Sequence, residues 1–172
     1  KQNNMRIVGI QGADITDGSK TLTLGLVWQI MRANISKTLA GLSKSGQEVS
    51  DVEMLKWAND RVQRAGKPTI RSFRDPSLSS AKFLLDLLET LRPGIVDASL
   101  VTEGRTEEES RLNAKLAISI ARKLGALIFL VPEDVVELRQ RLILTFIGSL
   151  STYCVFPTHA QCRWNCNERI CL

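Results

Sequence analysis

The amino-acid sequence predicts an all-α protein. The first observation is that apolar residues recur at helical spacing over residues 112–124. Arg122 and Lys123 lie near the end of this stretch, where basic side chains interact favourably with the helix dipole. The second is a pair of Ser/Thr-x-x-Glu spacings, beginning at Ser50 and Thr106, each typical of a helix start. The third is that glycine and proline follow the apolar stretches, where helices end.

Composition and charge favour a soluble globular protein. The 172 residues are 44% hydrophobic and 24% charged, enough for one domain with a core, or for one domain plus a piece of another. No apolar run approaches the roughly 20 residues that span a bilayer, and the first residues carry no export signal. The net charge of +5 is moderate and favours a basic patch for an acidic partner over nucleic-acid binding. We expect a cytoplasmic monomer that begins as if cut from a longer chain.

The last 19 residues contain all the cysteines, namely Cys154, Cys162, Cys166 and Cys171. The rest of the chain has none, as expected for a domain that folds in a reducing compartment without disulfides. We therefore separate residues 154–172 as an anomalous tail, disordered or non-native. His159, the only histidine, lies in this tail, but the spacings match no common zinc module, and we expect neither a metal nor a cofactor.

The first 36 residues predict one isolated helix. From Ser19 or Thr21 to residue 31 nearly every side chain is apolar, so we expect most of this helix to be buried. The side chains assigned to a core are Leu24, Val27 and Trp28. Either the helix docks on the rest of the chain, or it belongs to a domain of which only the last part is present.

A linker is predicted over residues 37–49, which combine Ser, Gly and Lys with few apolar residues. The Ser50 and Glu53 capping box then starts a helix that runs to about Ala65. Its apolar stripe is formed by Val52, Leu55, Ala58 and Val62, widened by Met54 and Trp57. Trp57 is assigned to the core, because apolar neighbours at helical spacing explain it without a ligand.

Two further helices follow in this region. Ser79 or Ser80 is expected to cap the first, which Pro93 and Gly94 stop, and its inward residues are Phe83, Leu84, Leu87, Leu88 and Leu91. After a short connector, a capping box of Thr106 with Glu109 starts the central helix.

The end of the region repeats an earlier pattern. Gly125 ends the central helix, residues 126–131 form an apolar run that we assign to a buried connector, and Pro132 opens a new turn. A final helix is expected over residues 139–151. Its short polar lead and nearly all-apolar body resemble residues 20–31, which indicates a weak internal repeat whose first copy is present only as its last part.

Four separated motifs resemble one known family. They are DGSKTLTLGLVWQIMR, DVEMLKWAND, SFRDPSLSSAKFLLDLLETLRPGIVD and LNAKLAISIARKLGALIFLVPEDVVE, in the order found in the fimbrin (plastin) family. Members of this family bundle actin filaments and are built of calponin-homology domains. The resemblance covers residues 5 to about 150, and it implies a compact all-helical fold of four main helices joined by shorter ones. It implies that residues 50–153 are the fourth and last calponin-homology domain, preceded by the last helix of a truncated third domain in residues 1–36.

The sequence departs from this family in two respects. Most of the third domain, the calcium-binding module and the first tandem pair are absent, so the chain would not carry the two complete actin-binding units that cross-linking needs. The tail over residues 154–172 resembles nothing expected at the family's C-terminus.

No catalytic set is present in the sequence, because no serine, cysteine or carboxylate pair has a partner at a diagnostic spacing, and we expect no enzyme. The best candidate surface is a series of six cations, Lys56, Arg61, Arg64, Lys67, Arg71 and Arg74. Without further information, a solvated helix face explains this series equally well. The resemblance favours binding, because the first helix of the second domain in each tandem pair contacts actin in the family. The residues it implies are Lys56, Asp60, Arg61 and Arg64.

The resemblance implies a second surface on the helix that begins near residue 20. The last helix of the first domain in a pair contributes to the family's main actin contact, and the matching exposed positions are Lys20, Gln29 and Arg32. We therefore expect binding to filamentous actin, as part of a fimbrin-like cross-linker of the actin cytoskeleton. The alternative is a calponin-homology module that scaffolds or regulates, with a protein partner or an anionic phospholipid as its ligand. Nucleic acid is not expected as a partner, because no aromatic residues interleave with the cations.

Overall fold

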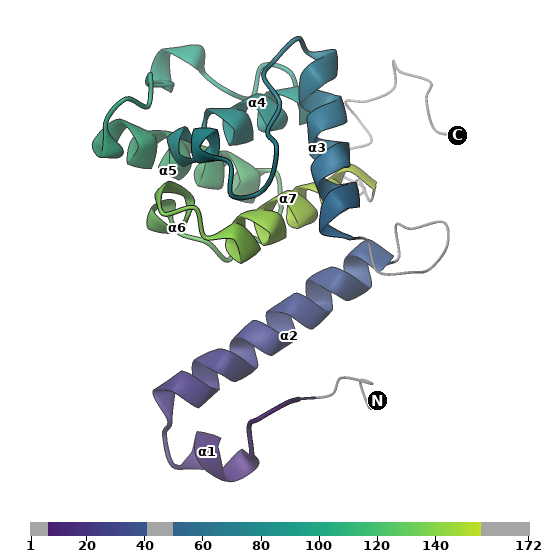
Figure 1. Cartoon of the computed structure of the whole chain (residues 1–172), viewed down its shortest axis with the longest axis vertical. Coiled ribbons are helices and arrows are strands. Elements are labelled where there is room, and N and C mark those ends of the chain that lie inside the picture. The colour runs from purple at the N-terminus through teal and green to yellow at the C-terminus, as the bar shows by residue number, and fades with distance from the viewer. Residues whose placement is uncertain (1–6, 41–49, 156–172) are drawn as a thin grey trace. The chain divides into compact units, whose positions relative to one another are not determined.

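The computed structural model describes residues 7–40 and 50–155 of the chain (Figure 1). Between residues 49 and 50 the chain divides into two compact units, which are described separately below. Every regular element in the described ranges is helical, so the all-α prediction is confirmed. Within those ranges, no helix has the combined length and apolar character needed to cross a membrane.

The first unit contains α1, Gly12–Thr16, and α2, Lys20–Ala40. The side-chain amide of Gln29 on α2 clamps the segment before α1: its Nε2 donates to the Val8 carbonyl and its Oε1 accepts from the Val8 N–H, both at 2.9 Å. Helix α2 is longer than predicted, because residues 32–40 contain neither glycine nor proline to end it before Gly41. The first four residues of the predicted linker over 37–49 are therefore helical, and the others lie outside the described residues.

Burial along α2 differs from the prediction. Leu24 and Val27, assigned to a core, are 69% and 54% exposed, and Ile30 is 49% exposed. Trp28 is half-buried. The described part of this unit provides only α1 and a short preceding segment to cover a helix of 21 residues, so much of the apolar surface of α2 stays uncovered.

The second unit is built from four longer helices: α3, Asp51–Arg64; α4, Lys82–Leu91; α5, Glu107–Lys123; and α7, Gln140–Val155. Shorter elements connect them, namely η1, Pro76–Ser80; η2, Ala98–Leu100; and α6, Pro132–Val136. Helix α5 packs against α4, α6 and η1, and α3 packs against α4 and α7 (Figure 1). The core between them is aliphatic, with Phe146 as its largest fully buried side chain.

Helix α3 begins with the predicted capping box. The Ser50 N–H donates to the Glu53 carboxylate at 2.8 Å, and the Glu53 N–H donates to the Ser50 hydroxyl at 3.2 Å. The buried stripe is Met54, Ala58 and Val62. Val52, predicted in the stripe, is 74% exposed, because it lies two residues before Met54 and so on nearly the opposite side of the helix.

The start of α4 differs from the prediction. Neither Ser79 nor Ser80 is its N-cap: their hydroxyls donate to the carbonyls of Pro76 and Ser77 within η1, each at 2.8 Å. The Ser80 hydroxyl also accepts a long hydrogen bond of 3.4 Å from the Lys82 N–H at the start of α4. The N-cap is Ala81, which has no side-chain cap and adopts a left-handed φ of 58°. The assignment of the inward face is confirmed for Phe83, Leu84, Leu87 and Leu88, while Leu91 is half-buried.

Helix α5 has its predicted N-cap, but the capping box is incomplete. The Thr106 hydroxyl accepts from the Glu109 N–H at 3.2 Å, whereas the Glu109 carboxylate accepts from the Arg105 N–H at 2.8 Å. Beyond α5, the predicted buried connector over 126–131 is wrong for three of its side chains: Leu127, Phe129 and Val131 are exposed. Burial alternates along this segment, so only one side of it faces the core.

The predicted internal repeat is present in the backbone geometry. Helices α1 and α6 each have five residues, and in both units three residues lead to the following long helix. At the start of α1 the Gln11 N–H donates to Asp14 at 2.7 Å, and at the start of α6 the Val131 N–H donates to Asp134 at 2.9 Å. Gly18 and Leu138, at matching positions after these helices, have φ of 75° and 55°.

Candidate functional site

The exposed face of α3 carries the four residues predicted to contact a partner. Lys56, Asp60 and Arg64 are spaced four residues apart, so they form a row along the helix. All three side chains are exposed, and Arg61 lies beside the row and is half-buried. The structure therefore places these four residues on one face, which we call the basic face of α3.

Trp57 belongs to this face and not to the core. It is half-buried, which corrects the prediction. The Arg61 guanidinium carbon lies 5.0 Å from the centroid of the Trp57 ring, an arrangement that contributes about 0.5–1 kcal/mol at an exposed site. The ring therefore orients Arg61 while keeping its charge at the surface. The four-residue spacing between the two residues is the sequence signal for this contact.

Arg61 and Arg64 also line an open groove that sequence analysis did not predict. Its volume is about 1050 Å³, and its walls are the end of α3, the outer side of α4 and parts of the segment 93–103. No sequence pattern indicates such a groove, because its walls come from separate parts of the chain that only the fold brings together.

Ion pairs occupy both lysines of the groove, and its remaining carboxylate, Glu89, accepts the N–H groups of Gly94 and Val96. Lys67 Nζ lies 3.4 Å from Asp86 Oδ1, and Lys82 Nζ lies 3.0 Å from Glu103 Oε2. The hydrogen bond from Lys82 holds the pKa of the Glu103 carboxyl below its usual value. Within the described ranges, Arg61 and Arg64 form no ion pair. These two guanidinium groups outnumber the one carboxylate of the groove that has no ion pair in the described ranges, Glu89, so the groove carries a small net positive charge.

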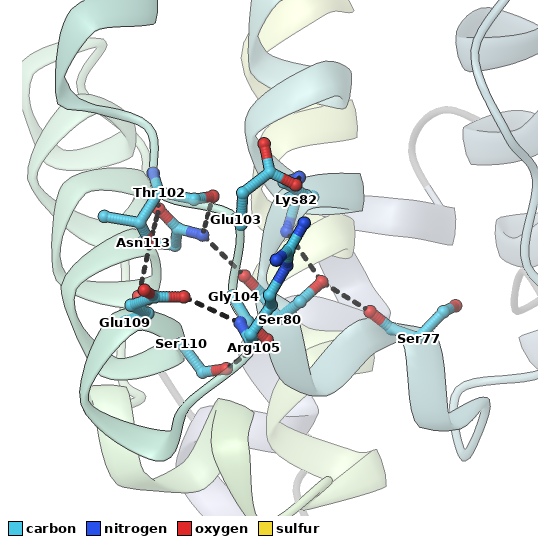
Figure 2. Close-up of polar contacts among 10 residues, drawn as sticks. All are labelled: Ser77, Ser80, Lys82, Thr102, Glu103, Gly104, Arg105, Glu109, Ser110 and Asn113. Carbon is cyan, nitrogen blue, oxygen red and sulfur yellow. Dashed lines mark hydrogen bonds and ion pairs between the residues drawn. The ribbon is translucent and has the colours of Figure 1, made fainter.

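One wall of the groove is fixed by Asn113, which is fully buried on α5 (Figure 2). Its amide nitrogen donates to the carbonyls of Ser80 and Thr102, both at 3.0 Å, and its amide oxygen accepts from the Thr102 N–H at 2.8 Å. Gly104 allows the backbone of this segment to approach Ser80 closely. Its φ is 70°, and a Cβ at this position would lie 2.8 Å from the Cβ of Ser80. The segment beside Glu103 is thus held in one place, and with it the position of the ion pair to Lys82.

The six-cation series predicted from the sequence does not form one free patch. Lys67 is paired with Asp86, as described above, and Arg74 Nε donates to the Gln140 side chain on α7 at 2.6 Å. Both side chains therefore make contacts within the unit. Of the six cations, those on the basic face of α3 form no ion pair within the described ranges.

The second predicted surface, on α2, is less coherent. Lys20 and Arg32 are exposed, but Gln29 is half-buried and both polar atoms of its amide bind Val8. Lys20 and Gln29 are nine residues apart, which places them about 180° apart around the helix axis. The three residues therefore do not share one face.

The residues considered for zinc are Cys154, His159, Cys162 and Cys166. Cys154 falls within the last turns of α7, and the other three are outside the described residues. Within the described ranges, no group of three or more His, Cys, Asp or Glu side chains is placed to hold a metal ion.

The helices that form the basic face and the groove match a known domain. A model of the calponin homology (CH) domain matches residues 48–156, which is more than half of the chain. The chain belongs to the calponin homology domain family. Because the match includes α3 to α7, the basic face and the groove are both parts of this CH domain.

Relatives of the chain carry the names predicted from its motifs, so the resemblance to the fimbrin (plastin) family is confirmed. The chain is 64% identical over 147 residues to fimbrin of Saccharomyces cerevisiae, covering 85% of this chain and 23% of that protein. It is 40% identical over 151 residues to plastin-2 of Danio rerio, covering 87% of this chain and 24% of the relative. The chain thus spans about a quarter of the length of these relatives.

A solved structure is similar to the CH domain and its preceding unit. The crystal structure of the actin-crosslinking core of Schizosaccharomyces pombe fimbrin matches with a TM-score of 0.67 and 57% sequence identity. The match covers 86% of this chain and 31% of that structure. The predicted calponin-homology fold is therefore confirmed, while the individual contact residues on α3 and α2 stay predictions.

Proposed function

We propose that this CH domain binds filamentous actin as part of a fimbrin-like filament cross-linker, through the basic face of α3. The observation that carries the proposal is that Arg61 and Arg64 stand on an exposed helix face without an ion pair in the described ranges. The relatives named fimbrin and the similar actin-crosslinking core support the choice of partner. The function is non-covalent binding, with no reaction and no cofactor.

The domain arrangement is part of the same proposal. Residues 50–153 act as the fourth CH domain, residues 1–36 as the end of the third, and the site of action is the cytoplasmic actin cytoskeleton. The division into two compact units supports this arrangement. So does the repeated geometry of α1 with α2 and α6 with α7, because two successive domains of one kind end in the same way.

Each residue of the basic face has a distinct part in binding. Arg61 and Arg64 provide planar guanidinium groups, which bind carboxylates with two parallel hydrogen bonds. Lys56 adds a point charge five residues before Arg61 on the same helix, which increases the rate of encounter with an acidic partner. The uncovered part of Trp57 provides an apolar anchor of the kind that contributes most to interface affinity. On α2, Lys20 and Arg32 are proposed as further contacts, and Gln29 contributes by holding the segment at Val8.

The test is co-sedimentation of the full chain with filamentous actin across a salt series. Arg61→Glu with Arg64→Glu should weaken binding about tenfold, since each reversed charge loses an attraction of a few tenths to one kcal/mol and gains a repulsion. The melting temperature should fall by only a few degrees, because the contact of Arg61 with Trp57 contributes about 0.5–1 kcal/mol and Arg64 is exposed. Arg105→Glu with Arg141→Glu makes the same change in net charge at two exposed sites outside the face, and should leave binding unchanged. Equal loss in both variants would exclude a local role for α3.

A second candidate function is a scaffolding or regulatory CH module that binds a protein partner or an anionic phospholipid. The observation that favours it is the groove in which Arg61 and Arg64 stand unpaired, because a phosphate group fits the guanidinium fork as well as a carboxylate does. Vesicles of phosphatidylcholine with about 30% phosphatidylserine distinguish the two functions. Sedimentation with these vesicles that falls steeply with salt, without actin binding, would favour the second candidate.

A further inference from the structure

A second surface of the CH domain combines unneutralised cations with exposed apolar side chains. A hollow of about 600 Å³ lies between the C-terminal half of α5 and the segment that enters α6. The residues that line it are Lys115, Ile118, Ser119, Arg122, Lys123, Leu130, Val131 and Pro132. It shares no residue with the groove beside α3. We call this hollow, together with the exposed residues Leu127 and Phe129, the α5–α6 surface.

The cations of this surface are free of local carboxylates. Lys115, Arg122 and Lys123 are exposed and form no ion pair within the described ranges. The acidic residues of α5 lie at its other end, where Arg111 pairs with Glu107 at 3.0 Å. Along the helix axis Glu109, the nearest of them, lies about 9 Å from Lys115 and about 20 Å from Arg122. At a screening length of about 8 Å, it therefore weakens the field of Lys115 but hardly that of Arg122 or Lys123.

The acidic residues of the neighbouring α6 already interact with other groups of the domain. Glu133 lies 3.4 Å from the Arg111 guanidinium, and the Asp134 carboxylate accepts the Val131 N–H at 2.9 Å. Glu137, at the end of α6, pairs with Arg139 at 2.7 Å. Arg111 is shared among Glu107, Glu108 and Glu133, and the hydrogen bond at Asp134 leaves that carboxylate charged. The three cations of α5 still outnumber the two carboxylates of α6, so this surface carries a small net positive charge.

The apolar part of the surface is the segment after α5. Leu127, Phe129 and Val131 are 54%, 42% and 49% exposed, and their alternation with buried neighbours places all three on one side of the segment. Neighbouring exposed apolar side chains beside free cations are typical of an interaction site, whereas single exposed ones are not.

The backbone of the same segment distinguishes a protein from a membrane as the partner. Within the described ranges, the N–H groups of residues 127–130 donate to no acceptor. Inserting these groups into hydrocarbon would leave them unsatisfied, which is costly. A protein segment can supply carbonyl or carboxylate acceptors, and it can fill a hollow that a flat bilayer cannot.

We propose that the α5–α6 surface binds an acidic segment of a partner protein that carries apolar residues. Its carboxylates pair with Lys115, Arg122 and Lys123, while its apolar side chains cover Leu127, Phe129 and Val131. The proposal does not rest on actin binding, because it uses none of the residues of the α3 face. It assigns the CH domain a second partner, held at the same time as the first.

The experiment uses the full chain and a fluorescein-labelled peptide of about 12 residues in which Asp alternates with Leu, with fluorescence anisotropy as the readout. Replacing Lys115, Arg122 and Lys123 with Glu should weaken binding about tenfold or more, since three attractions become repulsions. The matched control replaces the exposed Arg92, Arg105 and Arg141 with Glu and should bind as the parent does. Phe129→Asn should weaken binding without changing its salt dependence.

A peptide with Ser in place of Leu tests the apolar half of the proposal and should bind weakly. Three results would overturn the proposal: no saturable peptide binding, equal weakening in both triple variants, or no dependence on leucine. A fourth would replace it: binding to vesicles with about 30% phosphatidylserine that the α5 triple variant abolishes, without peptide binding, would identify a membrane surface instead. Circular dichroism confirms that each variant is folded.

Discussion

The paired helices α1 with α2 and α6 with α7 have the same local geometry but different burial. Val27 and Ile147 are each the eighth residue of their long helix, and they are 54% and 0% exposed. At the eleventh residue, Ile30 is 49% exposed and Leu150 is fully buried. Local sequence thus sets the short helix, the turn and the long helix. Whether the apolar face of the long helix is buried depends on the elements that pack against it, and for α7 these are α3 and α6.

The turns of the two copies show the same distinction. At the matching position before the long helix, Gly18 has φ of 75° and Leu138 has φ of 55°. A left-handed conformation costs a residue with a Cβ about 1–2 kcal/mol, and glycine almost nothing. The second copy accommodates Leu138 because burying the apolar face of α7 stabilises the fold by far more than the cost of this conformation. In the first unit, the described residues bury much less of α2.

The largest expected effect separates the two copies directly. Ile147→Ala should lower the free energy of unfolding of the CH domain by about 2–5 kcal/mol, because it removes fully buried groups from the core. Val27→Ala, at the matching position of α2, should change the stability of its unit by about 0.5 kcal/mol or less. Hydrogen exchange of the α7 and α2 amides measures the two units separately. A loss at Val27 as large as at Ile147 would show that the exposed face of α2 is covered in solution.

A smaller effect compares the side-chain amides that clamp each unit. Asn113 is fully buried and forms hydrogen bonds with three backbone groups. Gln29 is half-buried and forms hydrogen bonds with two, both on Val8. Asn113→Ala should lower the free energy of unfolding by about 2–3 kcal/mol, because it leaves buried groups unsatisfied.

Gln29→Ala should cost about 1 kcal/mol or less, because water can replace an exposed hydrogen bond. Thermal unfolding followed by circular dichroism measures both changes. If Asn113→Ala melted within a degree or two of the parent protein, the clamp at the wall of the groove would be unimportant for the fold.

The same contrast between local and tertiary causes explains what the sequence could predict. The four main helices of the CH domain, the Ser50 cap and the stripe at Ala58 and Val62 follow from patterns a few residues long. Ser79 and Ser80 were misassigned as caps because their hydroxyls can equally serve the preceding turn, and only packing decides between the two.

The candidate site was predicted only in part for the same reason. The four residues on the α3 face follow from helical spacing and from the family resemblance. The groove does not, because the pairing of Lys67 with Asp86 and of Lys82 with Glu103 depends on tertiary packing. The exposed half of the segment 126–131 was missed because a continuous apolar run does not indicate which side of it faces the core.

The smallest expected effect is a pH dependence carried by the loop before η1. Hydrogen bonds from the Arg71 N–H, and then from the Ser77 N–H and hydroxyl, hold the pKa of the Asp75 carboxyl below its usual value. A pKa that is lower in the folded state stabilises the protein above the unfolded pKa, and the stabilisation is lost as pH falls through the folded pKa. The CH domain should therefore become less stable as the pH is lowered below about 4.

Asp75→Asn tests this dependence with a side chain of nearly the same shape. The variant should melt lower than the parent at pH 7, because an amide accepts the Ser77 and Arg71 N–H bonds less strongly than a carboxylate does. The difference between the two proteins should shrink at acid pH, where the parent's carboxyl is also neutral. A difference in melting temperature that stayed constant across the series would mean that Asp75 acts through its shape alone. The local cap of η1, like the turn at Gly18, would then depend on backbone geometry more than on charge.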